Sequence, residues 1–305
     1  NSDATYPTQR CSDTKRRELF ELAEKHLAAV VSSGKHKLNP SVEEYWRLIN
    51  IGQLDQTYQE NLFEIPMGLN KSGELGYTIG YRINGASSLF GPKGNSSGKL
   101  KLTAPYYLSF GEGDIRRDLT CAISQLSTDK NTKVFKEYML GNAPFGLYCG
   151  KWDYRKMMEN SEWYAAVLAS DQKVCSGINV VKMRYPQVLL MYAEALNEAK
   201  KEEGTVPEDC YTYIDKVRAR AGLKGVKDSW RLYANDANKP NTYEGFQTIV
   251  RKERMIELAL EGQRFWSPGY GWFHGGVFPL LCEFYPIGSL PKGILLLLYV
   301  KNFFL

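Results

Sequence analysis

The chain has 305 residues, which is enough for one large domain or two smaller ones with a substantial core. Its formal net charge of +5 is spread along the sequence without a basic run of five residues, so we expect no nucleic-acid partner. The six cysteines are scattered and lack metal-ligand spacing, so we expect neither a metal site nor a cofactor. Twenty tyrosines and six tryptophans exceed what a core usually needs, and such rings often serve binding surfaces.

The first part of the chain is predicted to be helical. Its opening residues, NSDATYPTQR, contain neither the basic nor the apolar segment of a signal peptide. Residues 14–33 form an amphipathic pattern that ends at Gly34, with His26 at the edge of the core and not as a metal ligand. Ser41 and Glu44 then form a capping box that begins a second helix. We therefore predict a helical hairpin here.

The spacing of apolar residues changes after this hairpin. The short apolar run LFEIPMG, from Leu62, is interrupted by proline and indicates an edge strand. Residues 68–113 are rich in Gly, Ser, Asn and Pro yet carry many aromatic rings, so they are predicted to be an ordered, loop-rich insertion. Its rings either hold the loops to the core or line a ligand surface. Residues 113–118, GDIRRD, are predicted to begin another helix, and residues 151–164 form a second aromatic cluster.

Residues 184–222 form the most strongly patterned part of the chain. Pro186 suits a first helical turn, and apolar side chains follow at the three-and-four spacing of one helix face. Gly204 can end this helix with a positive φ, and Thr205 with Glu208 forms a capping box for the next. Two antiparallel helices joined by a very short turn are therefore predicted, as in one unit of a helical-repeat array.

The last patterned segment is a charged helix. Residues 230–241 are predicted to be a polar loop, after which Thr242 caps the helix. Opposite charges recur along it at three and four residues, which usually indicates a solvated, mutually paired face. Catalytic carboxylates at Glu257 and Glu261 are the alternative interpretation. Residues 267–305 follow neither a helix nor a strand period, and their run ILLLLYV is too short to span a bilayer.

Two segments resemble catalytic motifs, but neither matches its motif completely. GPKGNSSGKL lacks the glycine and the hydroxyl residue of a phosphate-binding loop, since Lys93 and Leu100 occupy those positions. GASSL, around Ser87, fails the nucleophile pattern at its last position, and only three histidines are available as general bases. The sequence therefore gives no positive indication of an enzyme. A hydrolase that uses Glu112 and Asp114 remains as an alternative.

Three ordered segments resemble the C-terminal signature of the SusD/RagB family. They are RYPQVLLMYAEALNEA, YIDKVRARAGL and IVRKERMIELALEGQRFW. FEIPMG and SFGEGDIRRDLT are similar to less constrained family features upstream, so the resemblance covers residues 14–266. Members of this family are outer-membrane lipoproteins of Bacteroidetes that capture glycans, or in some members peptides. They pass these ligands to a TonB-dependent transporter of the SusC type.

The resemblance implies a mainly α fold, in which tetratricopeptide-like helical hairpins scaffold a loop-rich insertion with minor β structure. We expect a hairpin region over residues 1–62, the insertion over 63–178, a C-terminal helical region over 179–266 and an atypical tail over 267–305, all within one domain.

The resemblance also implies a binding protein without catalytic residues. Its expected partners are an oligosaccharide or a peptide, a SusC-like transporter, and the outer membrane through a lipid anchor outside this sequence. An intracellular helical-repeat scaffold that binds another protein is the alternative from a different class. Five aromatic residues lie between the scaffold hairpins, where members of this family keep their binding aromatic residues, so the resemblance implies that they bind the ligand. These are Tyr81, Phe90, Tyr106, Tyr107 and Trp152.

A second set of residues is predicted to be structural. Arg254 and Glu257 lie three apart on one helix face, as do Glu261 and Arg264. We expect such charges to hold the last long helix against the central hairpin. The set consists of Arg218, Arg220, Arg254, Glu257, Glu261 and Arg264.

Overall fold

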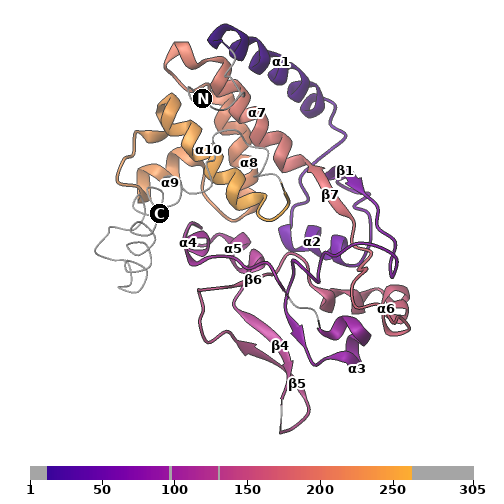
Figure 1. Cartoon of the computed structure of the whole chain (residues 1–305). Coiled ribbons are helices and arrows are strands. Elements are labelled where there is room, and N and C mark those ends of the chain that lie inside the picture. The colour runs from indigo at the N-terminus through magenta and orange to yellow at the C-terminus, as the bar shows by residue number, and fades with distance from the viewer. Residues whose placement is uncertain (1–11, 96–97, 130, 263–305) are drawn as a thin grey trace, which may run out of the picture.

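A computed structural model of the chain describes residues 12–95, 98–129 and 131–262 (Figure 1). Helices gather at one end of the molecule, and short helices with small sheets make up the other end. The predicted fold class, mainly α with minor β, is confirmed. None of the described helices is both long and apolar enough to cross a membrane. Residues 1–11, the predicted tail at 267–305 and Arg264 lie outside the described residues.

The helical end is drawn at the top of Figure 1. It consists of α1 (Asp13–Ser32), α7 (Tyr185–Ala199), α8 (Glu208–Arg220), α9 (Val226–Tyr233) and α10 (Tyr243–Glu257), with 3-10 turns at Lys201–Glu203 and Lys239–Asn241.

Helices α7 and α8 form the predicted hairpin. Pro186 lies in the first turn of α7, and Gly204 ends the connection with φ of +70°. Leu189, Ala193 and Val217 are fully buried between the two helices and their neighbours. The hairpin is therefore confirmed.

The beginning of α8 differs from the prediction. Pro207 is the N-cap residue and no side chain caps this helix, so the predicted capping box of Thr205 and Glu208 is wrong. Proline, with its fixed φ, leads the chain into the helix, and the acidic side chains of Glu208 and Asp209 interact favourably with the helix dipole.

Helix α1 packs along α7 (Figure 1). Its side chains Leu27, Val30 and Val31 lie partly buried against the core that α7, α8 and α10 form. Helix α2 (Val42–Asn50) belongs instead to the core of the insertion. The hairpin predicted for the first part of the chain is therefore wrong, because an amphipathic stripe predicts a buried face but not the element that covers it.

Three predicted helix beginnings are confirmed. Ser41 begins α2, Asp114 begins α5 (Ile115–Thr120), and Thr242 begins α10. In each case the side-chain oxygen accepts a hydrogen bond from a backbone N–H of the first turn.

Helix α9 was not predicted. Residues 230–233 belong to it and not to a polar loop. The side chains of Val226 and Trp230 are buried, and the Val226 N–H donates to the Asp215 carboxylate of α8 at 2.8 Å. The helix is short and begins after Gly225 without a side-chain cap, so the sequence carries little signal for it.

The insertion is built from short elements. Its helices are α3 (Ser87–Phe90), α4 (Ala104–Tyr107), α5 and α6 (Ser161–Leu168), with 3-10 turns at Gly91–Asn95 and Tyr154–Glu159. Its strands are β2 (Ile83–Asn84), β3 (Cys121–Ala122), β4 (Ser124–Thr128), β5 (Phe135–Met139) and β6 (Tyr148–Cys149). Strand β4 pairs with β2 in parallel and with β5 antiparallel, and β3 pairs with β6 antiparallel.

Two strands join the insertion to the helical end. The predicted edge strand is β1 (Asn61–Ile65), which pairs antiparallel with β7 (Val180–Arg184) in a two-stranded sheet. The Tyr185 N–H donates to the Glu60 carbonyl at 2.8 Å, which places residue 60 beside the first turn of α7. Segments far apart in the sequence therefore meet where α7 begins.

Candidate functional site

Three of the five predicted binding rings are core side chains. Tyr81, Phe90 and Trp152 expose only 2%, 2% and 4% of their surface. Trp152 packs edge-on against Trp46 with ring centroids 5.4 Å apart, and the Arg155 guanidinium lies 3.6 Å from the centre of the Tyr81 ring. Because no ring face is open to solvent, their predicted role in stacking on a sugar does not fit this structure.

Tyr106 and Tyr107 are the last two residues of the short helix α4. The Tyr106 hydroxyl donates to the Ile256 carbonyl of α10 at 3.2 Å, and its ring packs edge-on against Phe110 at 5.1 Å. Tyr106 therefore ties the insertion to the last helix. Tyr107 is partly buried, with the Arg117 guanidinium 5.4 Å from its ring centre, and it stays a predicted binding residue.

The predicted structural carboxylates lie in a buried charge network. Glu257 of α10 is contacted by Arg184 at 2.6 Å, Arg116 at 3.0 Å and Arg220 at 2.5 Å. Glu261 contacts Arg184 at 2.7 Å. These guanidinium groups come from α5, from the end of β7 and from α8, so one carboxylate joins three segments.

The network continues on both sides of Glu257. Glu253 pairs with Arg116 at 2.6 Å and with Arg218 at 3.0 Å. Glu60 pairs with Arg184 and Arg220, and Lys151 pairs with Glu261 at 2.7 Å. The side chains of the network are buried, so none of these pairs belongs to the solvated helix face that the sequence predicts. We call the set the buried charge network. Its members are Glu60, Asp114, Arg116, Lys151, Arg184, Arg218, Arg220, Glu253, Glu257 and Glu261.

Arg254 behaves differently from the other predicted structural residues. Its guanidinium contacts Glu194 of α7, and not Glu257 three residues along its own helix. Both side chains are partly exposed, at 20% and 16%. The expected pairing within the helix is therefore wrong, although Arg254 still joins α10 to the central hairpin.

The carboxylates of the buried charge network are poorly suited to catalysis. Burial would raise the pKa of Glu257, yet the Arg220, Arg184 and Arg116 guanidinium groups hold it well below its ordinary value of 4.5. Asp114 is enclosed with Arg116, which donates to it through Nε at 2.9 Å and Nη2 at 2.8 Å. A general acid needs a carboxyl group that holds its proton near neutral pH, and Glu257 does the opposite. The alternative of catalytic carboxylates on this helix therefore does not fit the geometry.

The described residues also give little support for thiol or metal chemistry. Burial raises the pKa of the Cys121 thiol to about 12 and that of Cys149 to about 11, so neither forms a thiolate readily at neutral pH. Within residues 12–95, 98–129 and 131–262, no three His, Cys, Asp or Glu side chains group to hold a metal ion.

One part of the insertion combines exposed lysines with two tyrosine rings, of which Tyr77 is partly buried and Tyr148 exposes only 5% of its surface. The Lys99 and Lys173 ammonium groups lie 5.2 Å and 5.8 Å from the centre of the Tyr77 ring. The Lys101 ammonium lies 5.2 Å from the centre of the Tyr148 ring. We call this the Tyr77–Tyr148 surface. It comprises Tyr77, Arg82, Lys99, Lys101, Tyr148 and Lys173.

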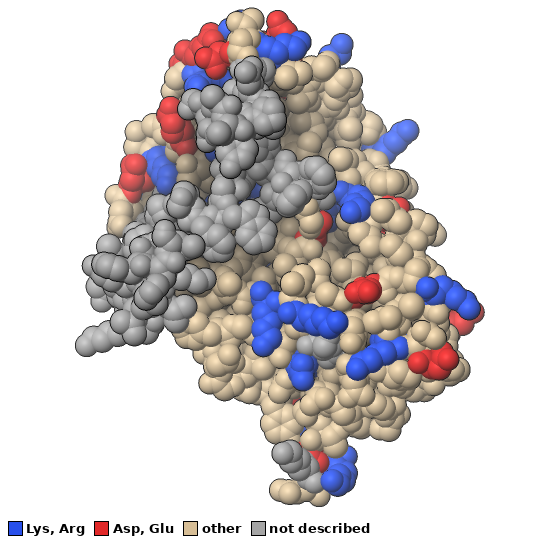
Figure 2. All heavy atoms as spheres, in the orientation of Figure 1, with Lys and Arg blue, Asp and Glu red and all other residues tan. Residues whose placement is uncertain are grey.

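The segment of residues 98–102 lies between the two rings. The Gly98 N–H donates to the Tyr77 carbonyl at 3.0 Å, and a Cβ on Gly98 would come within 2.6 Å of the Tyr148 ring. Leu102 exchanges backbone hydrogen bonds with Leu147 at 2.8 and 3.1 Å. The surface is thus held by backbone pairing on both sides. Figure 2 shows blue side chains grouped over the lower half of the molecule, where Figure 1 places the insertion.

The lysines of this surface were missed by the sequence analysis. The alternation in GKLKL, residues 98–102, is the signal that could have found them, since alternate residues of an extended segment share one face. That segment was tested only as a phosphate-binding loop.

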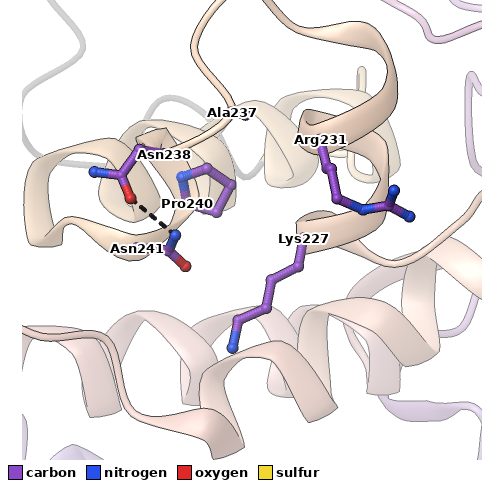
Figure 3. Close-up of a pocket in the computed structure, with 6 residues that line it drawn as sticks. All are labelled: Lys227, Arg231, Ala237, Asn238, Pro240 and Asn241. Atoms are coloured by element: carbon purple, nitrogen blue, oxygen red, sulfur yellow. Dashed lines mark hydrogen bonds between the residues drawn. The ribbon is translucent and has the colours of Figure 1, made fainter.

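Two shallow pockets lie at the helical end. The first has a volume of about 350 Å³ and lies between α9 and the turn before α10, lined by Lys227 and Arg231 on one side and Asn238 and Asn241 on the other (Figure 3). Its polar side chains already have partners within the protein. Lys227 pairs with Glu208, Arg231 pairs with Asp228, and Asn241 donates to Asn238. Little hydrogen-bonding capacity is therefore left for a ligand.

The second pocket, of about 430 Å³, lies where the loop before α2 meets α7 and α8. Its lining includes Lys37, Leu189 and Lys216, and its aromatic residue, Tyr185, exposes only 8% of its surface. The Tyr77–Tyr148 surface is the stronger candidate for a ligand with apolar and polar faces, because the Tyr77 ring is partly exposed there.

Comparison with known proteins gives one consistent result. The sequence profile of the SusD family matches residues 59–267. A SusD-like protein P2 of Formosa agariphila is 32% identical over 102 residues, which are 33% of this chain and 19% of that protein. A SusD homologue of Bacteroides thetaiotaomicron is 26% identical with a TM-score of 0.61, covering 80% of this chain and 47% of that one.

A surface glycan-binding protein A of Bacteroides thetaiotaomicron, solved with laminarihexaose, has the same fold. It is 16% identical with a TM-score of 0.52, and the match covers 83% of this chain and 50% of that one. The chain thus spans about half the length of these solved structures. Because the family profile matches more than half of the sequence, the chain belongs to the SusD family.

Proposed function

We propose that this protein binds oligosaccharides at the bacterial cell surface and takes part in nutrient uptake. The observation that carries the proposal is the family match over residues 59–267. It is supported by the fold shared with a surface glycan-binding protein solved with laminarihexaose.

The binding site that we propose is the Tyr77–Tyr148 surface together with Tyr107. A sugar ring has an apolar face that packs on aromatic side chains and a polar rim that accepts hydrogen bonds. Tyr77 and Tyr107 are partly buried, and the exposed Lys99 lies beside the Tyr77 ring, with the exposed Lys101 two residues further along the chain. This part of the insertion therefore offers both kinds of contact.

The proposed place in the cell follows from family membership. We expect a lipid-anchored protein on the outer membrane that passes its ligand to a SusC-like TonB-dependent transporter. Copurification of the tagged, full-length protein with such a transporter from outer-membrane extracts tests this part. Recovery from the cytosol without any transporter would contradict it.

Calorimetry with a panel of neutral and acidic oligosaccharides tests the binding function itself. The variant Tyr77→Ala should weaken binding at least about tenfold, since the ring supplies part of the apolar contact. Tyr233→Ala is the matched control, because this tyrosine is 61% exposed on α9, away from the insertion. Binding of peptides and of no oligosaccharide would contradict the proposal, and loss of binding in Tyr233→Ala alone would place the site at the helical end.

A further inference from the structure

The lysines of the Tyr77–Tyr148 surface lack acidic partners. Lys99, Lys101 and Lys173 are exposed, and none of them pairs with an Asp or Glu among residues 12–95, 98–129 and 131–262. The nearby Glu74 carboxylate accepts a hydrogen bond from Thr78 at 2.6 Å and not from a lysine. This surface therefore carries positive charge that the protein itself does not neutralise.

Two other lysines of the chain are arranged differently. Lys151 lies in the buried charge network with Glu261, and Lys227 of the first pocket pairs with Glu208. Each of these charges has an acidic partner within the fold, so neither is free to bind an anion. The lysines around Tyr77 and Tyr148 contact ring faces instead, which is worth only about 0.5–1 kcal/mol for an exposed ammonium group.

The backbone fixes where these charges are presented. Gly98 and Leu100 donate to the carbonyls of Tyr77 and Thr78, both at 3.0 Å, which holds the segment in place. Lys99 and Lys101 are two residues apart in the sequence, so their Cα atoms are roughly 7 Å apart if this segment is extended. Two ammonium groups can therefore reach neighbouring anionic groups of one ligand without ordering a loop first.

We propose that this surface selects acidic oligosaccharides, whose sugars carry carboxylate or sulfate groups. The proposal rests on the glycan-binding function above and names the class of glycan. The lysines supply charge-assisted hydrogen bonds to the anionic groups, and the partly buried Tyr77 ring contacts the apolar face of a sugar of the same ligand. A neutral glycan would contact the tyrosine but would not form the charge-assisted hydrogen bonds to the lysines.

The charges favour an oligosaccharide over other anions. A nucleic acid needs a larger basic footprint than these few lysines, in a chain whose net charge is only +5. An acidic peptide would use the lysines but would leave the partly exposed Tyr77 ring without a sugar ring to contact. We therefore take a peptide as an outcome of the test that would overturn the proposal.

Matched ligands test the proposal with the full chain. We compare an oligogalacturonide with its carboxyl-reduced form, and a sulfated oligosaccharide with its desulfated form, by calorimetry. At least one anionic form should bind about tenfold or more tighter than its neutral counterpart. This preference should shrink as the salt concentration rises, because the Debye length falls from about 10 Å at 0.1 M to about 3 Å at 1 M. The two pairs separate carboxylate from sulfate recognition.

Two double variants locate the effect. Lys99→Gln with Lys101→Gln should reduce the preference for the anionic form to within about twofold, since each charge-assisted contact is lost. Lys25→Gln with Lys35→Gln removes the same net charge near the other end of the molecule and should leave the preference unchanged. Equal loss in both double variants would show a general charge effect and would overturn the proposal.

The remaining outcomes separate the two proposals. Equal affinity for neutral and anionic forms would overturn the selectivity and leave glycan binding standing. Binding of acidic peptides with no glycan bound would overturn both. An anionic preference that persists in Lys99→Gln with Lys101→Gln would overturn the assignment of this surface.

Discussion

Arg184 and Glu257 lie 2.6 Å apart, each with a side chain only 1% exposed, where the strand that joins the insertion to the helical end meets the last helix. Arg184 ends β7 directly before α7, and Glu257 is the final residue of α10. The same carboxylate also contacts Arg116 of α5 and Arg220 of α8. One buried acidic group therefore fixes the insertion, which carries the proposed binding surface, against the helical end.

Removing that carboxylate should be costly. Glu257→Ala removes one carboxylate partner from three buried guanidinium groups and leaves excess positive charge in the core, so we expect the free energy of unfolding to fall by roughly 3–5 kcal/mol. Arg254→Ala is the matched control, because its pair with Glu194 is partly exposed and should be worth under about 1 kcal/mol. Urea unfolding at neutral pH measures both, with ligand affinity determined on the folded protein. Wild-type stability with lost binding in Glu257→Ala would instead place the charged helix in the binding site.

The network predicts a direction for acid unfolding. The pKa values of Glu253, Glu257 and Glu261 are lowered in the folded protein. Their stabilising contribution is therefore complete above about pH 4.5, and it is lost as the pH falls through the lowered pKa values. Asp114 opposes this, because burial raises its pKa. We expect the free energy of unfolding to level off above about pH 5 and to fall at lower pH.

The control for this pH profile is Glu257→Gln, which removes one titrating group with little change in shape. Its profile should be flatter below about pH 4.5 than that of the wild type. Identical slopes for the two proteins would show that Glu257 does not titrate with a lowered pKa.

Gly98 offers a test of the proposed surface that leaves its charges intact. Its φ of +52° disfavours any other residue, and a Cβ would come 2.6 Å from the Tyr148 ring. Gly98→Ala should therefore lower the free energy of unfolding by roughly 1–3 kcal/mol and weaken oligosaccharide binding. Gly34→Ala is the control, since φ is +62° there and the space around a Cβ is empty. If both variants keep full affinity for the ligand, the segment at Gly98 does not shape the site.

The buried rings should matter for stability and not for binding. Phe90→Ala opens a cavity in the core of the insertion, and we expect a loss of roughly 3–5 kcal/mol. The protein that remains folded should bind oligosaccharide with unchanged affinity. Thermal unfolding and calorimetry on the same sample check this. An unchanged unfolding midpoint with abolished binding would restore Phe90 to the binding residues that the sequence predicts.

Local signals in the sequence predict local structure well here. The hairpin of α7 and α8 follows from helical periodicity with Pro186 and Gly204 at its boundaries. Ser41 and Thr242 were found as caps because the hydrogen bond that they make reaches only three residues along the chain. Such features need no knowledge of tertiary structure.

Long-range contacts could not be predicted in this way. The spacing of Arg254 and Glu257 favours a pair within the helix, yet Arg254 reaches α7 and Glu257 is surrounded by guanidinium groups from distant segments. Composition likewise shows that aromatic rings are abundant, but it does not distinguish the buried Phe90 from the partly buried Tyr77. Partner choice and burial depend on how segments far apart in the sequence come together.

Hydrogen–deuterium exchange of the full chain, with and without a saturating acidic oligosaccharide, tests most directly where the ligand binds. We predict that bound ligand slows amide exchange over residues 77–82, 98–101 and 146–148, which carry all members of the Tyr77–Tyr148 surface except Lys173. Residues 226–241, which hold the first pocket, should exchange at the same rate in both samples. Slower exchange confined to residues 226–241 would contradict the account and place the binding site at the helical end.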